Sequence, residues 1–138
     1  MTTFTDKYQV LKQVFGYDSF RPGQEHLINA ILAGKDVLGI MPTGAGKSIC
    51  YQVPALMLPG ITIVISPLIS LMSDQVKALN QAGVHAAYIN SSLTENQIRA
   101  ALLYAAQGQY KIIYVAPERL NTMRFLDFAC RADISMVT

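Results

Sequence analysis

The chain has 138 residues, of which 51% are hydrophobic and 14% charged, so it is long enough for one domain with a substantial core. It contains no apolar run near the roughly 20 residues that cross a bilayer, and we expect no membrane partner. The net charge of +2 excludes a global basic field, so nucleic-acid binding would depend on locally placed donors.

The first residues and the cysteines indicate a reducing compartment. Residues 1–7 lack the charged start and apolar stretch of a signal peptide, so we expect a cytoplasmic location. Cys50 and Cys130 have no C-x-x-C spacing, and we expect both to be buried as small hydrophobic side chains rather than to form a disulfide or a metal site.

The chain should begin with two helices. Apolar side chains at helical spacing predict a helix over 5–15 that ends at Gly16. Pro22 and Gly23 mark a loop, and a second helix is predicted over 24–33 with Gly34 as its C-cap.

A phosphate-binding motif follows. Val37–Ile40 is predicted to be a strand, and Met41-Pro42-Thr43-Gly44-Ala45-Gly46-Lys47-Ser48 leads into a predicted helix, which is the order of a P-loop. Backbone N–H groups from Thr43 to Gly46 and the helix N-terminus would cradle phosphates. Lys47 would reach the β and γ phosphates of a nucleotide, and Ser48 would ligate Mg²⁺. The strict motif has glycine where this chain has Met41, and a glycine-rich turn that only opens a helix is the alternative.

Strands and helices alternate over the rest of the chain. The β-branched run 61–65 predicts a buried strand, and a helix is expected over 68–81 with Leu71, Met72, Val76 and Leu79 in the core. Further elements are predicted in this order: strand 86–89, helix 94–107, strand 110–115, helix 121–131 and strand 134–138. This alternation predicts an α/β fold with a largely parallel sheet flanked by helices.

Four stretches in a fixed order resemble the motifs of RecQ-type DNA helicases of superfamily 2. Residues 15–25 resemble the family's nucleotide-recognition motif, 41–55 its motif I, 66–76 its motif Ia and 114–120 its motif Ib. The resemblance implies the N-terminal part of a first RecA-like domain, with a helical lead-in over 1–36 and a P-loop core over 37–138.

The nucleotide-recognition stretch also has a physical interpretation. The Gln24 amide can donate and accept hydrogen bonds together, as reading of adenine N6 and N7 requires. Tyr17 and Arg21 can stack a base between a ring and a guanidinium plane. The resemblance assigns these three positions to the adenine of ATP; a solvated helix start with a packed tyrosine is the alternative.

Candidate DNA-binding residues follow two of the predicted strands. In a parallel sheet the carboxyl ends of strands face the ligand crevice, where hydroxyls and N–H groups bind phosphates. The resemblance places Ser66, Pro67, Ser70 and Gln75 along single-stranded DNA, and Pro117, Glu118 and Arg119 along its next stretch. The alternatives are a helix N-cap for Ser66 and a surface ion pair for Arg119.

The resemblance implies an ATP- and Mg²⁺-dependent 3′-to-5′ DNA helicase of recombination and repair. Its partners would be single-stranded and partly duplex DNA, and its location cytoplasmic, with nucleoid association in a bacterium. The family's D-E-A-H motif would follow the strand 134–138, so this sequence alone is expected to bind nucleotide without hydrolysing it. A nucleotide-binding module without catalysis and a superfamily-2 RNA helicase or translocase are the alternatives.

Overall fold

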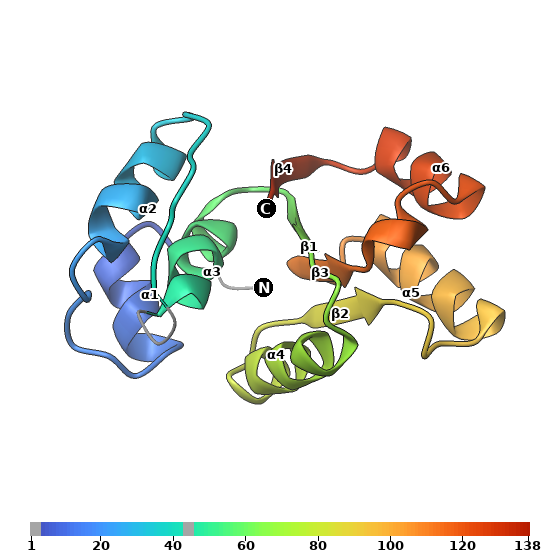
Figure 1. Ribbon diagram of the computed structural model, residues 1–138, viewed down its shortest axis with the longest axis horizontal. Coiled ribbons are helices and arrows are strands. Elements are labelled where there is room, and N and C mark those ends of the chain that lie inside the picture. Colours follow the sequence, from blue (N-terminus) through green and yellow to red (C-terminus); the bar gives the residue numbers. More distant parts are fainter. Residues whose placement is uncertain (1–3, 43–45) are drawn as a thin grey trace. The chain divides into compact units, whose positions relative to one another are not determined.

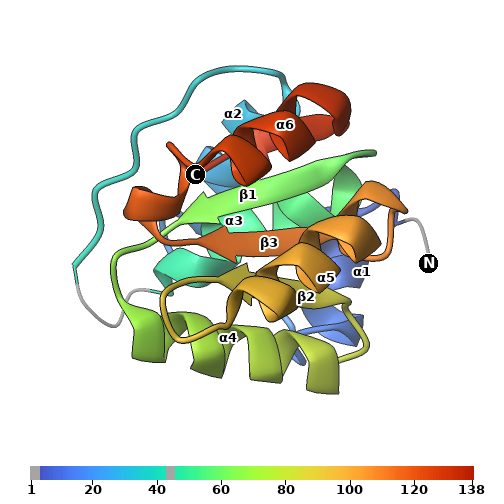
Figure 2. The ribbon, with the colours of Figure 1, turned by 90° about the vertical axis from the view of Figure 1, so that its right-hand side faces the viewer.

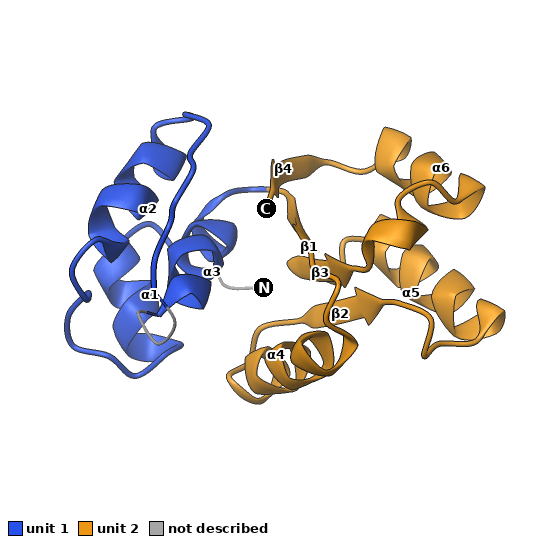
Figure 3. Ribbon diagram, viewed as in Figure 1, with its two compact units in different colours: residues 1–59 blue, residues 60–138 orange. Residues whose placement is uncertain are grey.

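A computed structural model describes residues 4–42 and 46–138 of the chain. These residues form two compact units, which meet in the sequence between Pro59 and Gly60 (Figure 3). The boundary falls inside the range 37–138, and the division between 1–36 and 37–138 stays a prediction. Each unit is described by itself.

The first unit is built on helices α1 (Lys7–Gln13), α2 (Gln24–Leu32) and α3 (Lys47–Met57) (Figure 1). Helix α3 packs against both α1 and α2. Its core holds fully buried side chains from all three helices: Val10, Leu11, Ile28 and Val53. The Asp6 carboxylate accepts a hydrogen bond from the backbone N–H of Tyr8 and caps α1, which explains why the helix begins at Lys7.

The strand predicted over Val37–Ile40 is wrong. These residues form neither helix nor strand, and the side chains of Leu38 and Ile40 are 85% and 87% exposed. A strand needs a neighbour that accepts and donates its backbone hydrogen bonds. No described strand pairs with this segment, so the strand preference of its apolar residues is not enough to make it a strand.

The second unit is a parallel sheet, as predicted (Figure 2). Its strands are β1 (Ile61–Ile65), β2 (Ala86–Ile89), β3 (Ile112–Val115) and β4 (Ile134–Val137), in the spatial order β2-β3-β1-β4. Every strand pair is parallel, and Ile65 of β1 lies opposite Val115 of β3 at their carboxyl ends. The predicted α/β fold class is confirmed.

Helices cover this sheet. Helices α5 (Glu95–Ala106) and α6 (Met123–Arg131) lie over one face (Figure 2) and share an apolar cluster with alternate sheet residues, among them Ile63, Ile113 and Val115. Helix α4 (Ile69–Gln81) packs beside β2, and a short 3-10 helix, η1 (Pro117–Arg119), follows β3. No helix in the described part of the chain is long and apolar enough to span a membrane.

Two side chains differ from the predicted core. Leu71 is 43% exposed, whereas its neighbour Met72 is fully buried, because adjacent residues of a helix point about 100° apart and only one of the two can face the sheet. Cys130 is exposed, because α6 buries Phe125 and Phe128 on its inner face. Cys50 is buried, as predicted.

Gly60 occupies a position where a side chain would collide with the backbone. A Cβ atom on Gly60 would lie 2.4 Å from the carbonyl oxygen of Asp133 and 2.5 Å from Ser135 Oγ. The Gly60 N–H donates to Ser135 Oγ at 2.7 Å, and its carbonyl accepts from Lys111 Nζ at 3.1 Å. Glycine here lets the start of β1 lie against the start of β4.

Replacing Gly60 by alanine should therefore destabilise the second unit by about 1–3 kcal/mol, because the added methyl group must push strand backbone aside. Urea unfolding measures this loss. Ser135→Ala removes one hydrogen bond without adding atoms and should cost less, about 1 kcal/mol. Wild-type stability of the Gly60→Ala variant would contradict the packing described for this corner.

Candidate functional site

The start of helix α3 carries the described part of the predicted P-loop. Gly46 is the N-cap residue, with a positive φ of 77° that suits glycine, and Lys47 and Ser48 form the first two positions of the helix. Lys47 is exposed, and the first turn of α3 contains no acidic residue. The N–H groups of a first helical turn have no partner within the helix and attract anions. Thr43, Gly44 and Ala45 lie outside the described residues.

The buried amide of Gln24 joins the loop before α2 to this helix start. The side chain of Gln24 is only 3% exposed. Its Oε1 accepts a hydrogen bond from the Arg21 N–H at 2.7 Å, and its Nε2 donates to the Gly46 carbonyl at 3.0 Å. An amide has two N–H donors and two acceptor lone pairs, so each end keeps capacity for one more bond. Gln24 therefore positions both loops.

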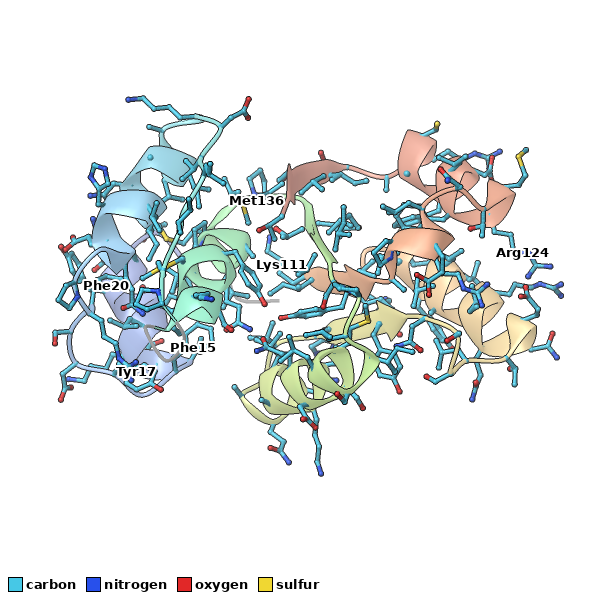
Figure 4. The ribbon with its side chains drawn as sticks, in the orientation of Figure 1. Phe15, Tyr17, Phe20, Lys111, Arg124 and Met136 are labelled. Atoms are coloured by element: carbon cyan, nitrogen blue, oxygen red, sulfur yellow. The ribbon has the colours of Figure 1, made fainter. Side chains whose placement is uncertain are left out.

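The surroundings of Gly46 are close-packed. A Cβ atom at Gly46 would lie 2.4 Å from Gln24 Nε2 and 3.7 Å from Arg21 Nη1, so these side chains reach the helix start. The Cys50 thiol lies 3.6 Å from Met41 Sδ, and burial raises the pKa of that thiol. The structure thus brings Arg21 and Gln24 together with Gly46, as the nucleotide prediction requires. Tyr17 is 49% exposed in the loop after α1 (Figure 4).

A charged cluster fastens α1 to the first turn of α2. Lys7 Nζ lies 2.8 Å from a carboxylate oxygen of Glu25, and the Tyr8 hydroxyl donates to the same carboxylate. Hydrogen bonds from Lys7 and then from Tyr8 hold the pKa of Glu25 below its ordinary value, and the bond to Glu25 raises the pKa of Lys7. The Glu25 carboxylate thus serves the contact between helices. Sequence reasoning missed this cluster, because nothing in the spacing of residues 7, 8 and 25 signals it.

In the second unit, the candidate DNA-binding residues follow two paired strands. Ser66 comes directly after β1, and Pro117 begins η1, two residues beyond the end of β3. The Ser66 N–H donates to the Val115 carbonyl at 3.1 Å, which keeps the carboxyl ends of β1 and β3 side by side. Ser66 Oγ accepts from the Leu68 N–H at 3.3 Å and so shapes the turn into α4, whose N-cap residue is Leu68. Pro67, Ser70 and Glu118 are exposed near these strand ends.

Two of the predicted DNA-binding side chains are already engaged. Gln75 is half-buried on α4, and its Oε1 accepts from the Tyr114 hydroxyl at 3.0 Å. Arg119 Nη1 lies 3.6 Å from Glu95 Oε1, and Arg124 Nη1 lies 3.7 Å from the other oxygen of Glu95. Glu95 thus faces two arginines at the start of α5. No sequence pattern predicts this cluster, since Glu95 is distant in the chain from both arginines.

The residues at the start of α3 fit a phosphate group. Lys47 supplies a positive charge, the helix supplies N–H donors, and no acidic side chain of the first turn opposes an anion. Ser48 supplies one hydroxyl for Mg²⁺, a metal that proteins often hold by one or two groups together with substrate phosphates. The described residues contain no cluster of three or more histidine, cysteine, aspartate or glutamate side chains that could hold a metal without a phosphate.

Comparison with known proteins gives a consistent result. Residues 21–135 match the model of the DEAD/DEAH box helicase family. The chain is 50% identical over 129 residues to the ATP-dependent DNA helicase RecQ of Bacillus subtilis, and 49% identical over 128 residues to that of Haemophilus influenzae. Each alignment covers 93% of this chain but only 22% and 21% of the relatives, so the chain spans about a fifth of their length.

The fold has a counterpart among solved structures. A hypothetical ATP-dependent RNA helicase from Sulfolobus tokodaii matches with a TM-score of 0.64 over 92% of this chain and 37% of its own. The two sequences are 21% identical, so the likeness supports the α/β fold of a RecA-like helicase domain and says nothing of the substrate.

Replacing Gln24 by alanine should loosen the start of α3. The change leaves the Arg21 N–H and the Gly46 carbonyl without their partner, which should lower the free energy of unfolding of the first unit by about 2 kcal/mol. Hydrogen exchange at the amides of residues 46–50 should become faster. Gln9→Ala removes an exposed amide from α1 and provides the control. Equal exchange rates in the two variants would contradict the role assigned to Gln24.

Proposed function

This chain belongs to the DEAD/DEAH box helicases and is RecQ-like within them, and from this we propose that it supplies the ATP-binding part of an ATP-dependent DNA helicase. The observation that carries the proposal is the meeting of Gln24 and Arg21 with Gly46 directly before Lys47 and Ser48. A nucleotide carries a base and a chain of phosphates in one molecule. Here side chains suited to a base, Gln24 and Arg21, lie next to the helix start that suits phosphates.

In the proposed complex each residue has a separate task. Gln24 reads the adenine edge with its remaining donor and acceptor, and the exposed Tyr17 and Arg21 stack against the base. Lys47 and the N–H groups of α3 hold the phosphates, with Thr43 to Gly46 in the loop before them. Ser48 contributes its hydroxyl to Mg²⁺, which would offset the charge of the phosphates. Nothing in this assignment requires Glu25, whose carboxylate is held by α1.

Single-stranded DNA is proposed to lie along the carboxyl ends of β1 and β3. Support comes from the exposed polar groups and backbone that follow these paired strands, at Ser66–Ser70 and at Pro117–Arg119. Such groups bind phosphodiesters without reading sequence. Gln75 would act indirectly, through its bond to Tyr114. In the complete protein, nucleotide-driven closing and opening of two RecA-like domains would move the enzyme along one strand.

The finer features of the proposal rest on the resemblance of the four sequence motifs to those of RecQ-type helicases. We propose 3′-to-5′ movement, action on single-stranded and partly duplex DNA, a role in recombination and repair, and a cytoplasmic location with nucleoid association in a bacterium. RNA helicase activity is the competing function. Stimulation of the ATPase of the complete protein by poly(dT) and by poly(U) separates the two, and stronger stimulation by the RNA would refute the DNA assignment.

Lys47→Ala should reduce ATP turnover by the complete protein about 100-fold or more, because a charged group that faces the transferring phosphate is lost. Binding of single-stranded DNA without nucleotide should change little, since the proposed DNA residues lie in the other unit. Lys35→Ala, which removes an exposed lysine from the same stretch, is the matched control. Near-normal turnover by the Lys47→Ala variant would refute the P-loop assignment.

Glu95→Gln should strengthen binding of single-stranded DNA about two- to fivefold at low salt. The change releases Arg119 from a long ion pair with the exposed Glu95 carboxylate that contributes at most about 1 kcal/mol. Arg119→Gln should weaken binding and reduce its salt dependence. Fluorescence anisotropy with a labelled oligonucleotide measures both, with Asp36→Asn as a control of equal charge change. Unchanged or weaker binding by the Glu95→Gln variant would contradict a role of Arg119 in the DNA interface.

A further inference from the structure

A groove runs between helices α5 and α6 on the second unit. Its volume is about 630 Å³, within the usual range of protein binding sites. All residues that line it belong to residues 60–138, so the groove lies within the second unit. The residues of the proposed nucleotide and DNA sites do not line it, and neither site explains it.

The floor of the groove is apolar. Leu102, Leu103 and Phe128 line it, together with the small side chains of Ala106 and Ala132. Leu102 and Phe128 are buried, whereas Leu103 is 58% exposed. Since a large apolar side chain gains free energy when it leaves water, Leu103 offers a contact that a ligand with its own apolar group would complete.

The rim of the groove is basic. Arg99, Arg124 and Arg131 line it with one acid, Asp127, so three of the five arginines in the chain gather at this place. Arg131 Nη2 lies 3.2 Å from Asp127 Oδ1, and Arg124 contacts Glu95 at 3.7 Å. Both pairs are solvent-exposed and therefore weak. Arg99 has no ion-pair partner among the described residues, and Arg124 extends outward from α6 (Figure 4).

The combination of floor and rim favours one kind of occupant. We propose that this groove binds a short segment of a partner protein that carries carboxylate side chains and at least one bulky apolar side chain. The arginine guanidinium groups can form bidentate hydrogen bonds with the carboxylates of the partner, and the apolar floor can contact its bulky apolar side chain. This inference goes beyond the proposed helicase function and does not depend on it.

A nucleic acid fits the groove less well. Proteins hold single strands by stacking bases on exposed aromatic rings as well as by charge. The aromatic residue in the lining is Phe128, which is only 6% exposed, so its ring offers no free face. A nucleic acid would use the arginines alone and leave the apolar floor in water.

The test uses the complete protein and a fluorescein-labelled peptide of alternating aspartate and phenylalanine residues, followed by fluorescence anisotropy. Leu103→Glu and the double variant Arg99→Glu/Arg131→Glu should each weaken binding about tenfold or more, equivalent to about 1.4 kcal/mol. All three positions are exposed, so the substitutions disturb no core. Lys77→Glu reverses an exposed charge on α4 and should leave peptide binding unchanged. ATPase activity equal to wild type checks that each variant is folded.

A second peptide, with serine in place of phenylalanine, tests the apolar floor and should bind at least about tenfold more weakly. Equal binding of the two peptides, or of the groove variants and wild type, would overturn the proposal. So would displacement of the peptide by poly(dT) together with a matching loss of DNA binding in the Arg99→Glu/Arg131→Glu variant, because the groove would then be a nucleic-acid surface. Loss of peptide binding with DNA binding retained supports the proposal.

Discussion

The first unit depends on the hydrogen bonds of one buried amide. Gln24 accepts from the Arg21 N–H and donates to the Gly46 carbonyl, and so fixes the loop before α2 against the start of α3. At this buried position, a side chain without both a donor and an acceptor would leave the Arg21 N–H or the Gly46 carbonyl without a hydrogen bond. Among the described residues these two bonds use one N–H and one acceptor site of the amide, and in the proposed nucleotide site the remaining N–H and lone pair would read the base.

In the second unit the corresponding constraint is the parallel pairing of β1 and β3. Because their carboxyl ends lie opposite each other at Ile65 and Val115, the chain segments that leave the two strands begin side by side. Exposed polar groups therefore gather at one edge of the sheet although they are about 50 residues apart in the sequence. The outer surface of α5 and α6 carries a separate combination of exposed leucine and arginine that the pairing of strands does not explain.

Much of the fold could be predicted from the sequence, because the spacing of apolar residues along the chain indicates where helices and strands form. The strands at 61–65 and 86–89 were predicted with the observed bounds, and the helices to within a few residues. Val37–Ile40 failed because strand formation depends on a partner, which local composition does not report. The choice between Leu71 and Met72 depends on which side of α4 faces the sheet. Among the candidate site residues, Gln24 was predicted from the resemblance to RecQ motifs together with the chemistry of its amide, whereas the ion pairs of Glu95 are long-range contacts without a sequence signal.

The proposed nucleotide site lies where the loop before α2 meets the start of α3. Hydrogen–deuterium exchange of the complete protein with and without MgATP tests this directly. MgATP should slow exchange in two separate segments, residues 17–25 and residues 46–53, and MgGTP should have a smaller effect on the first segment because its base presents a different edge to Gln24. Unchanged exchange in both segments at saturating MgATP would rule out a nucleotide site at this place.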